Sequence, residues 1–162
     1  MKTVGGLKPD IISYNSAITS CEKSGWWKKA MSLLREMPQK RNLTPIVRSY
    51  NSAITACGNG GQWEDVLRLL REMPGAELNP NTVTYNTVIT ACAKAGEWKQ
   101  ALSLFMKNWQ VGLEHDVVSF RAAIGACRGA GPWEMALDIL RQKPSRGVKV
   151  NAFSYSQVIG VC

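Results

Sequence analysis

Residues 82–105 read TVTYNTVITACAKAGEWKQALSLF, and this stretch decides the fold. In its first half, the spacing i, i+3, i+6, i+7 and i+10 puts five residues on one face of a helix: Thr82, Tyr85, Val88, Ile89 and Cys92. Gly96 is expected to end this helix, because glycine adopts a left-handed φ without strain. A second apolar face follows on Trp98, Ala101, Leu102, Leu104 and Phe105. The stretch therefore predicts two consecutive helices.

The same pattern recurs along the whole chain with a period of 35 residues. The aromatic residue of the first helix recurs in steps of 36, 35, 35 and 35, at Tyr14, Tyr50, Tyr85, Phe120 and Tyr155. Cysteines recur in the same steps, at Cys21, Cys57, Cys92, Cys127 and Cys162. Tryptophan and glycine keep this register, at Trp27, Trp63, Trp98, Trp133, Gly25, Gly61, Gly96 and Gly131. Because four residue types share one period, we predict an all-α solenoid, in which each helix pair packs only against its neighbours.

The period divides the chain into repeats and predicts where each helix lies. The expected segments are 1–10 (tail of a preceding repeat), 11–46, 47–81, 82–116 and 117–151 (repeats 1 to 4), and 152–162 (first helix of a truncated repeat 5). We predict helices near 11–23, 28–38, 47–58, 63–73, 82–94, 98–109, 117–129, 133–143 and 152–162. Proline lacks an amide hydrogen, so Pro38, Pro74 and Pro144 are expected to stop three of the second helices. We expect the chain to be part of a longer array, or its ends to be covered by partners.

Length, composition and charge exclude several classes of protein. The chain has 162 residues, and its hydrophobic content of 45% is too high for a disordered tail. Charged or polar residues interrupt every apolar stretch, so no membrane insertion is expected, and neither a secretory signal nor a transit segment is recognisable. The 20 Lys and Arg residues outnumber the 12 Asp and Glu residues, which gives a formal net charge of +8. This excess favours a nucleic acid or an acidic surface as partner.

The cysteines, the histidine and the tryptophans give no support to an enzyme or a metal site. No CxxC pair exists, and equivalent positions in stacked helices lie about 8–10 Å apart, too far for disulfides. We therefore expect all five cysteines to be unlinked, and at least the four within complete repeats to be buried. His115 is the single histidine and has no catalytic partner in sequence, and the repeated tryptophan is expected to pack rather than to stack on bases. We predict no enzyme activity, no metal and no cofactor.

Polar residues recur directly after the repeated aromatic residue, at Asn15, Asn51, Asn86, Arg121 and Ser156. Asparagine is a mediocre helix former, because its side chain competes for backbone hydrogen bonds, so its recurrence needs a reason. An amide donates and accepts hydrogen bonds, and it therefore suits the reading of a base edge. The alternatives are a first-turn bond to the backbone, or a contact with the neighbouring repeat.

A second polar set precedes each first helix, at Asp10, Ile46, Asn81, Asp116 and Asn151. Asp and Asn are preferred N-caps, so capping alone explains most of this set. Capping and base reading are compatible at this position. Ile46 is the exception, because its side chain does neither by hydrogen bonding.

Two further sets share the helix face of these asparagines. The residues three positions earlier are mostly apolar and lie off the core stripe, which suits them to sandwich bases: Ile12, Arg48, Val83, Val118 and Phe153. Further along the same face are Lys23 and Lys94, with Arg128 one position earlier in its own repeat, and these three are candidates for phosphate contacts. A solvated basic side chain is the alternative for each of these three.

Several stretches resemble the pentatricopeptide repeat. Its opening resembles the segments IISYN (11–15), TVTYN (82–86) and VVSFR (117–121). Later parts of it resemble KAG (94–96), ALSLF (101–105) and REM (35–37 and 71–73). The resemblance covers essentially the whole chain. The tetratricopeptide repeat has a nearby period, but its Trp/Leu/Gly/Tyr first-helix pattern is missing here.

The resemblance implies a right-handed superhelix of helix-turn-helix repeats whose concave face binds single-stranded RNA, one base per repeat. It also implies a mitochondrial or chloroplast protein in RNA processing, stability or translation. In the family, the fifth and the last residue of a repeat select the base; here these pairs are Asn15 with Ile46, Asn51 with Asn81, Asn86 with Asp116, and Arg121 with Asn151. From their donors and acceptors, the third pair should prefer uracil, and the second should accept either pyrimidine because the Asn81 amide can turn to suit either.

A second class of function stays open at this stage. Pentatricopeptide-like proteins also serve as structural subunits, where the same surfaces contact proteins. Ile46, Arg48 and Arg121 depart from the family pattern, and the basic residues are unevenly distributed along the chain. The alternative is therefore a scaffold subunit that binds proteins within a large organellar complex.

Overall fold

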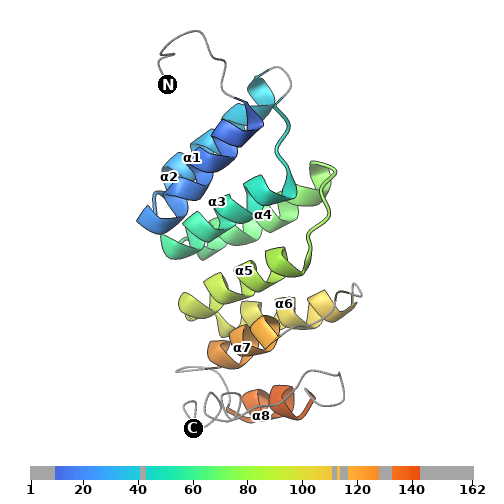
Figure 1. Ribbon diagram of the computed structural model, residues 1–162. Coiled ribbons are helices and arrows are strands. Elements are labelled where there is room, and N and C mark those ends of the chain that lie inside the picture. Colours follow the sequence, from blue (N-terminus) through green and yellow to red (C-terminus); the bar gives the residue numbers. More distant parts are fainter. Residues whose placement is uncertain (1–9, 41–42, 111–112, 114–116, 128–132, 143–162) are drawn as a thin grey trace. The chain divides into compact units, whose positions relative to one another are not determined.

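The computed structural model describes residues 10–40, 43–110, 113, 117–127 and 133–142 (Figure 1). The described residues form eight α-helices and one short 3₁₀ turn, and none of them lies in a strand. The chain divides into two compact units, Met1–Asn79 and Pro80–Cys162. Within the described residues, each unit contains two pairs of helices.

The first unit is built from α1 (Ile11–Ser24), α2 (Trp27–Glu36), α3 (Val47–Asn59) and α4 (Trp63–Gly75). Helix α1 packs against both α2 and α3, and α3 packs against α4. Hydrogen bonds join Asn15 to Ser49, Thr19 to Ser52 and Glu22 to Asn59. Since the partners advance together along both helices, α1 and α3 run parallel, as stacked first helices of successive repeats do.

The second unit repeats this arrangement with α5 (Thr82–Lys94), α6 (Trp98–Gln110), α7 (Val117–Ala126) and α8 (Trp133–Gln142). Helix α5 packs against α6 and α7, and α7 packs against α8. The Phe105 and Phe120 rings meet edge to face, with centroids 5.3 Å apart. Both rings are fully buried, so this contact holds the second helix of one repeat against the first helix of the next.

The helix boundaries follow from local sequence signals, with one correction. Every predicted helix within the described residues is confirmed to within two or three residues, while the one at 152–162 lies outside them. Glycines with left-handed φ follow the first helices at Gly25, Gly61 and Gly96. Pro38 follows α2 in the 3₁₀ turn, but Pro74 lies inside α4, which continues to Gly75. The prediction that Pro74 stops this helix was therefore wrong, and Pro144 lies outside the described residues.

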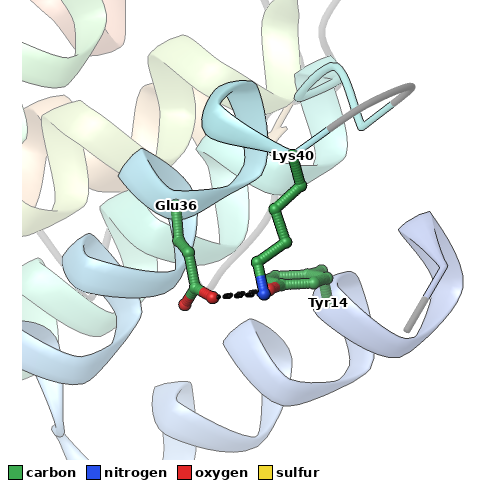
Figure 2. A network of polar contacts seen from close by, with 3 residues as sticks. All are labelled: Tyr14, Glu36 and Lys40. Carbon is green, nitrogen blue, oxygen red and sulfur yellow. Dashed lines mark hydrogen bonds and ion pairs between the residues drawn. The ribbon is translucent and has the colours of Figure 1, made fainter. Parts of the chain in front are cut away.

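A polar network joins the first helix of repeat 1 to the end of its second helix (Figure 2). The Tyr14 hydroxyl donates to Glu36 Oε1 over 2.9 Å, and Lys40 Nζ lies 2.8 Å from the same oxygen. Lys40 Nζ also lies 5.8 Å from the centre of the Tyr14 ring. The hydrogen bonds from Lys40 and then Tyr14 lower the pKa of the Glu36 carboxyl, and Glu36 in turn raises the pKa of Lys40.

The cysteines lie in the core, as the sequence predicts. Cys21, Cys57, Cys92 and Cys127 are buried and unpaired, and Cys162 lies outside the described residues. Burial, the largest cause in each case, raises the pKa of the Cys57 thiol to about 12 and that of Cys92 to about 11. These thiols therefore stay protonated at neutral pH and act as small apolar groups.

The repeated tryptophans whose side chains are described, Trp27, Trp63 and Trp98, are half-buried rather than exposed. Trp27 is half-buried, and its ring lies so close to Gly60 that an added Cβ there would meet Trp27 Cδ1 at 2.5 Å. The small residue in the middle of each second helix is fully buried in all four cases: Ala30, Val66, Ala101 and Ala136.

Within the described ranges, none of the helices is long and apolar enough to cross a bilayer.

Candidate nucleic-acid interface

The first turn of each described first helix exposes a side chain at the position predicted to sandwich bases. Ile12, Val83 and Val118 are 69%, 59% and 50% exposed, and Arg48 is exposed at the same register. Phe153 lies outside the described residues. Single exposed apolar residues are common on protein surfaces, but the recurrence at one register is not explained by packing. These side chains are available to contact an apolar or aromatic ligand.

A groove of about 400 Å³ lies along α5 and α7 in the second unit. It is lined by Thr90, Ala93, Lys94, Val118, Arg121, Ala122 and Gly125. Three of these residues are predicted site residues of three different kinds, namely Lys94 for phosphate, Val118 for sandwiching and Arg121 for base reading. The structure therefore brings a cation, an apolar surface and a forked hydrogen-bond donor to one groove.

The asparagines after the repeated aromatic residue bond to the next repeat. Ser49 Oγ donates to Asn15 Oδ1 over 2.6 Å, and Ser119 Oγ donates to Asn86 Oδ1 over 2.5 Å. Asn15 and Asn51 are half-buried, and Asn86 is only 7% exposed. The alternative drawn from the sequence, a contact with the neighbouring repeat, is therefore correct for the amide oxygens of Asn15 and Asn86.

The serines that hold these amides were not identified in the sequence. Ser49 and Ser119 are both fully buried, which is unusual for a hydroxyl in the first turn of a helix. A periodic signal was present, because a hydroxyl residue stands two positions before each of these polar residues, at Ser13, Ser49, Thr84, Ser119 and Ser154. It was overlooked because serine and threonine also fit helix starts for reasons of capping alone.

The residue before a first helix caps that helix where its side chain has an acceptor, as at α1 and α5. Asp10 Oδ1 accepts from the Ser13 amide over 2.8 Å, and this bond is the main cause that lowers the Asp10 pKa. Asn81 Oδ1 accepts from the Thr84 amide and hydroxyl, each over 3.0 Å. The Asn81 amide is therefore held in one orientation, and the expectation that it turns freely was wrong. Ile46 has no side-chain acceptor, so there only the reverse bond forms, from its own N–H to Ser49 Oγ over 3.1 Å.

The remaining site residues predicted from the sequence are either exposed or lie outside the described residues. Lys23 and Lys94 are exposed in the last turns of α1 and α5. A cation at a helix C-terminus is also favoured by the helix dipole, so their position has a structural reason of its own. Asp116, Arg128 and Asn151 lie outside the described residues, as does His115.

Comparisons with known proteins agree on one family. The PPR repeat family matches residues 45–94 and 80–128, and the PPR repeat matches residues 12–42. No curated protein sequence matches the chain. A crystal structure of the pentatricopeptide repeat protein PPR10 in complex with an 18-nt psaJ RNA element is 26% identical, with a TM-score of 0.85 over 98% of this chain and 23% of that chain.

A crystal structure of PPR10 from maize is 22% identical, with a TM-score of 0.83 over 95% of this chain and 22% of that chain. This chain thus spans about a quarter of the length of these solved proteins. The predicted fold class, an all-α solenoid of helix pairs, is confirmed. With its family match over more than half of its length, the chain belongs to the PPR repeat family.

Proposed function

We propose that this chain is a single-stranded RNA-binding module and not an enzyme. The observation that carries the proposal is the groove along α5 and α7, which brings Lys94, Val118 and Arg121 together. Binding of single-stranded RNA needs a cation near the phosphates, a surface on which bases stack, and polar groups at the base edges. The groove offers one of each.

Charge and family membership support this proposal. The formal net charge of +8 favours a polyanion, and the first helices repeat an exposed apolar residue at the spacing of the repeats. The similar PPR10 structure was solved with an RNA element bound. We extend the proposal to RNA processing, stability or translation in mitochondria or chloroplasts, and to a place for this chain within a longer array whose repeats begin near residues 11, 47, 82 and 117.

The proposal includes a base preference for the repeat that contains Asn86. Asp116, if it faces the same base, offers acceptors only, and uracil presents an N3–H donor where cytosine presents an acceptor. We expect Asp116→Asn to relax a uracil preference toward either pyrimidine, by roughly 5–150-fold in the ratio of dissociation constants. Short RNAs that differ only at that nucleotide measure this ratio. Equal ratios before and after the substitution would show that this pair does not read the base.

Titration of the whole chain with single-stranded RNA tests the proposed function. We expect saturable binding that is tighter for single-stranded than for double-stranded RNA, and that weakens in Arg121→Ala. Arg141→Ala is the matched control, because Arg141 is an exposed arginine of the same unit that lies on the second helix α8, 3.7 Å from Asp138. Absence of binding at low salt, or equal loss in both variants, contradicts the proposal.

One observation favours a second candidate, a scaffold that binds protein. An apolar pocket of about 400 Å³ lies on the first helix pair, and its lining includes Tyr14, Cys21, Trp26 and Leu33. Trp26 is 66% exposed, and exposed tryptophan is enriched at protein interfaces. A chain that binds no RNA in the titration above but forms a stable complex through Trp26 fits this candidate better.

A further inference from the structure

Two serines make the same contact in two separate units of the molecule. Ser49 of α3 donates to Asn15 of α1, and Ser119 of α7 donates to Asn86 of α5, over 2.6 and 2.5 Å. Both serines are fully buried. Each bond therefore runs from the first helix of one repeat to the polar residue of the repeat before it, which is the residue proposed to read the base.

The direction of the bond in the first unit follows from the backbone. The Ile46 N–H lies 3.1 Å from Ser49 Oγ, and a backbone N–H only donates, so the hydroxyl oxygen must accept there. The single hydroxyl proton is then left for Asn15. The Asn15 atom 2.6 Å away must be the amide oxygen, because an NH₂ group does not accept. The amide NH₂ consequently points away from Ser49.

We propose that Ser49 and Ser119 are positioning residues that determine base specificity, by fixing the amide of the preceding repeat with its NH₂ end toward the RNA. The inference rests on the proposed RNA-binding function. An amide without such a partner presents either its oxygen or its nitrogen to a base, and so discriminates poorly. A buried hydroxyl that holds the oxygen removes one of the two choices.

The fixed orientation has a defined consequence for the repeat of Asn86. An amide NH₂ donates to a carbonyl oxygen, and uracil presents one on each side of its N3–H. If the amide turned over, its oxygen would accept instead, and guanine presents donors at N1–H and its 2-amino group. Ser119 therefore favours uracil over guanine without touching either base.

The test compares Ser119→Ala with Ser119→Thr in the whole chain, using RNAs that carry each of the four bases at the nucleotide whose preference disappears in Asn86→Ala. We expect the unsubstituted chain to prefer uracil over guanine by roughly tenfold or more, and Ser119→Ala to reduce this ratio to about threefold or less. Affinity averaged over the four RNAs should change by less than about threefold. Ser119→Thr, which keeps the hydroxyl, should restore the ratio.

A matched control removes the same group at the same register without touching an asparagine. The Ser13 hydroxyl donates to Asp10 within its own helix start, so Ser13→Ala should leave the uracil-to-guanine ratio unchanged. If Ser119→Ala fails to fold, Asn86→Asp replaces it, since this variant keeps an acceptor for Ser119 and loses the NH₂ group. It should lose the uracil preference while its helical circular dichroism stays intact.

The outcomes separate this inference from the function on which it rests. A chain that binds RNA and prefers uracil equally with and without the Ser119 hydroxyl overturns the positioning role and leaves RNA binding standing. Retention of the preference in Asn86→Asp does the same. Equal binding of all four RNAs by the unsubstituted chain overturns base reading itself, and a chain that binds no RNA overturns the proposed function.

Discussion

Asn108 of α6 is a polar residue in an apolar position. It is fully buried, and among the described residues neither its side-chain nitrogen nor its oxygen has a hydrogen-bond partner. The corresponding residues of the two preceding repeats are Met37 and Met73, which are also fully buried. A buried amide without partners costs about 1–3 kcal/mol, so this repeat carries a destabilising residue where the two preceding repeats carry an apolar one.

We therefore expect Asn108→Met to stabilise the second unit by about 1–3 kcal/mol. Urea unfolding followed by circular dichroism measures the change as a higher midpoint at an unchanged slope. Met73→Asn is the reciprocal control in the first unit and should destabilise that unit. A lower midpoint for Asn108→Met would falsify this account of the position.

The second prediction at this scale concerns the Cys57 thiol, whose pKa is raised by burial from its ordinary value of 9.0 to about 12. Above about pH 9 the unfolded chain loses this proton while the folded chain keeps it. The folded state then binds more protons than the unfolded state, so stability falls as pH rises through this range.

Urea unfolding of the unsubstituted chain and of Cys57→Ala isolates this contribution from that of the other titrating groups. We expect the stability of the unsubstituted chain relative to Cys57→Ala to be constant below about pH 8 and to decrease toward about pH 10.5. Labelling of the Cys57 thiol at about pH 8 should be slow in the folded chain and fast in urea. A pH-independent difference, or rapid native labelling, contradicts the buried position.

At the scale of the elements, the close approach of α2 to the end of α3 limits what residue 60 can be. A Cβ on Gly60 would meet Trp27 Cδ1 at 2.5 Å, and this atom belongs to a rigid ring that is already half-buried. We expect Gly60→Ala to displace the ring and to cost about 1–3 kcal/mol of unfolding free energy.

Gly75, the last residue of α4, provides the matched control for this measurement. Nothing lies within 4 Å of a Cβ built on it, so Gly75→Ala should be neutral or stabilising by up to about 1 kcal/mol. Both variants are compared by denaturant unfolding under the same conditions. Equal midpoints for the two would show that the Trp27 contact does not constrain the turn.

At the scale of the whole molecule, charge should determine how strongly RNA binding depends on salt. Binding of single-stranded RNA releases counterions, so the logarithm of the binding constant should fall linearly with the logarithm of the salt concentration. Each phosphate contact should contribute about −0.7 to the slope of this line. We expect Lys94→Ala to reduce the slope by about that amount, because Lys94 lines the groove of α5 and α7.

Lys99→Ala tests whether the effect depends on position or only on net charge. Lys99 is also exposed and lies in the same unit, but it stands on the second helix α6, with its ammonium 5.5 Å from the centre of the Trp98 ring. Filter-binding titrations at several salt concentrations give the slope for each variant. If both lysines change the slope equally, the chain binds RNA through its overall charge and not through this groove.

Most of the fold was predictable because its determinants are local. Tyr14, Ile18 and Cys21 form a buried stripe at helical spacing, and Gly25 adopts the left-handed φ that ends the helix. These signals act over one or two turns and recur with the period, so each repeat confirms the others. Pro74 shows the limit, because a proline one residue from a helix end gives the boundary only to within a turn.

The candidate site was predictable at the level of its surface and not at the level of its hydrogen bonds. Helical periodicity puts Ile12, Val83 and Val118 off the core stripe, and all three are exposed. The partner of Asn86 is Ser119, which is 33 residues away in sequence. No pattern within one repeat predicts which end of an amide faces solvent, since this depends on how the next repeat is stacked.

The sequence by itself therefore determined the repeat, its helices, the buried cysteines and the family, because these depend on spacing and on local backbone preference. Only the tertiary structure decided the orientation of the Asn15 amide, the cap that holds Asn81, and the gathering of Lys94, Val118 and Arg121 in one groove. The physical reason lies in the range of the interactions. A helix is specified by hydrogen bonds between residues four apart, whereas the direction of a side-chain amide is set by whichever donor the packing of two distant helices brings beside it.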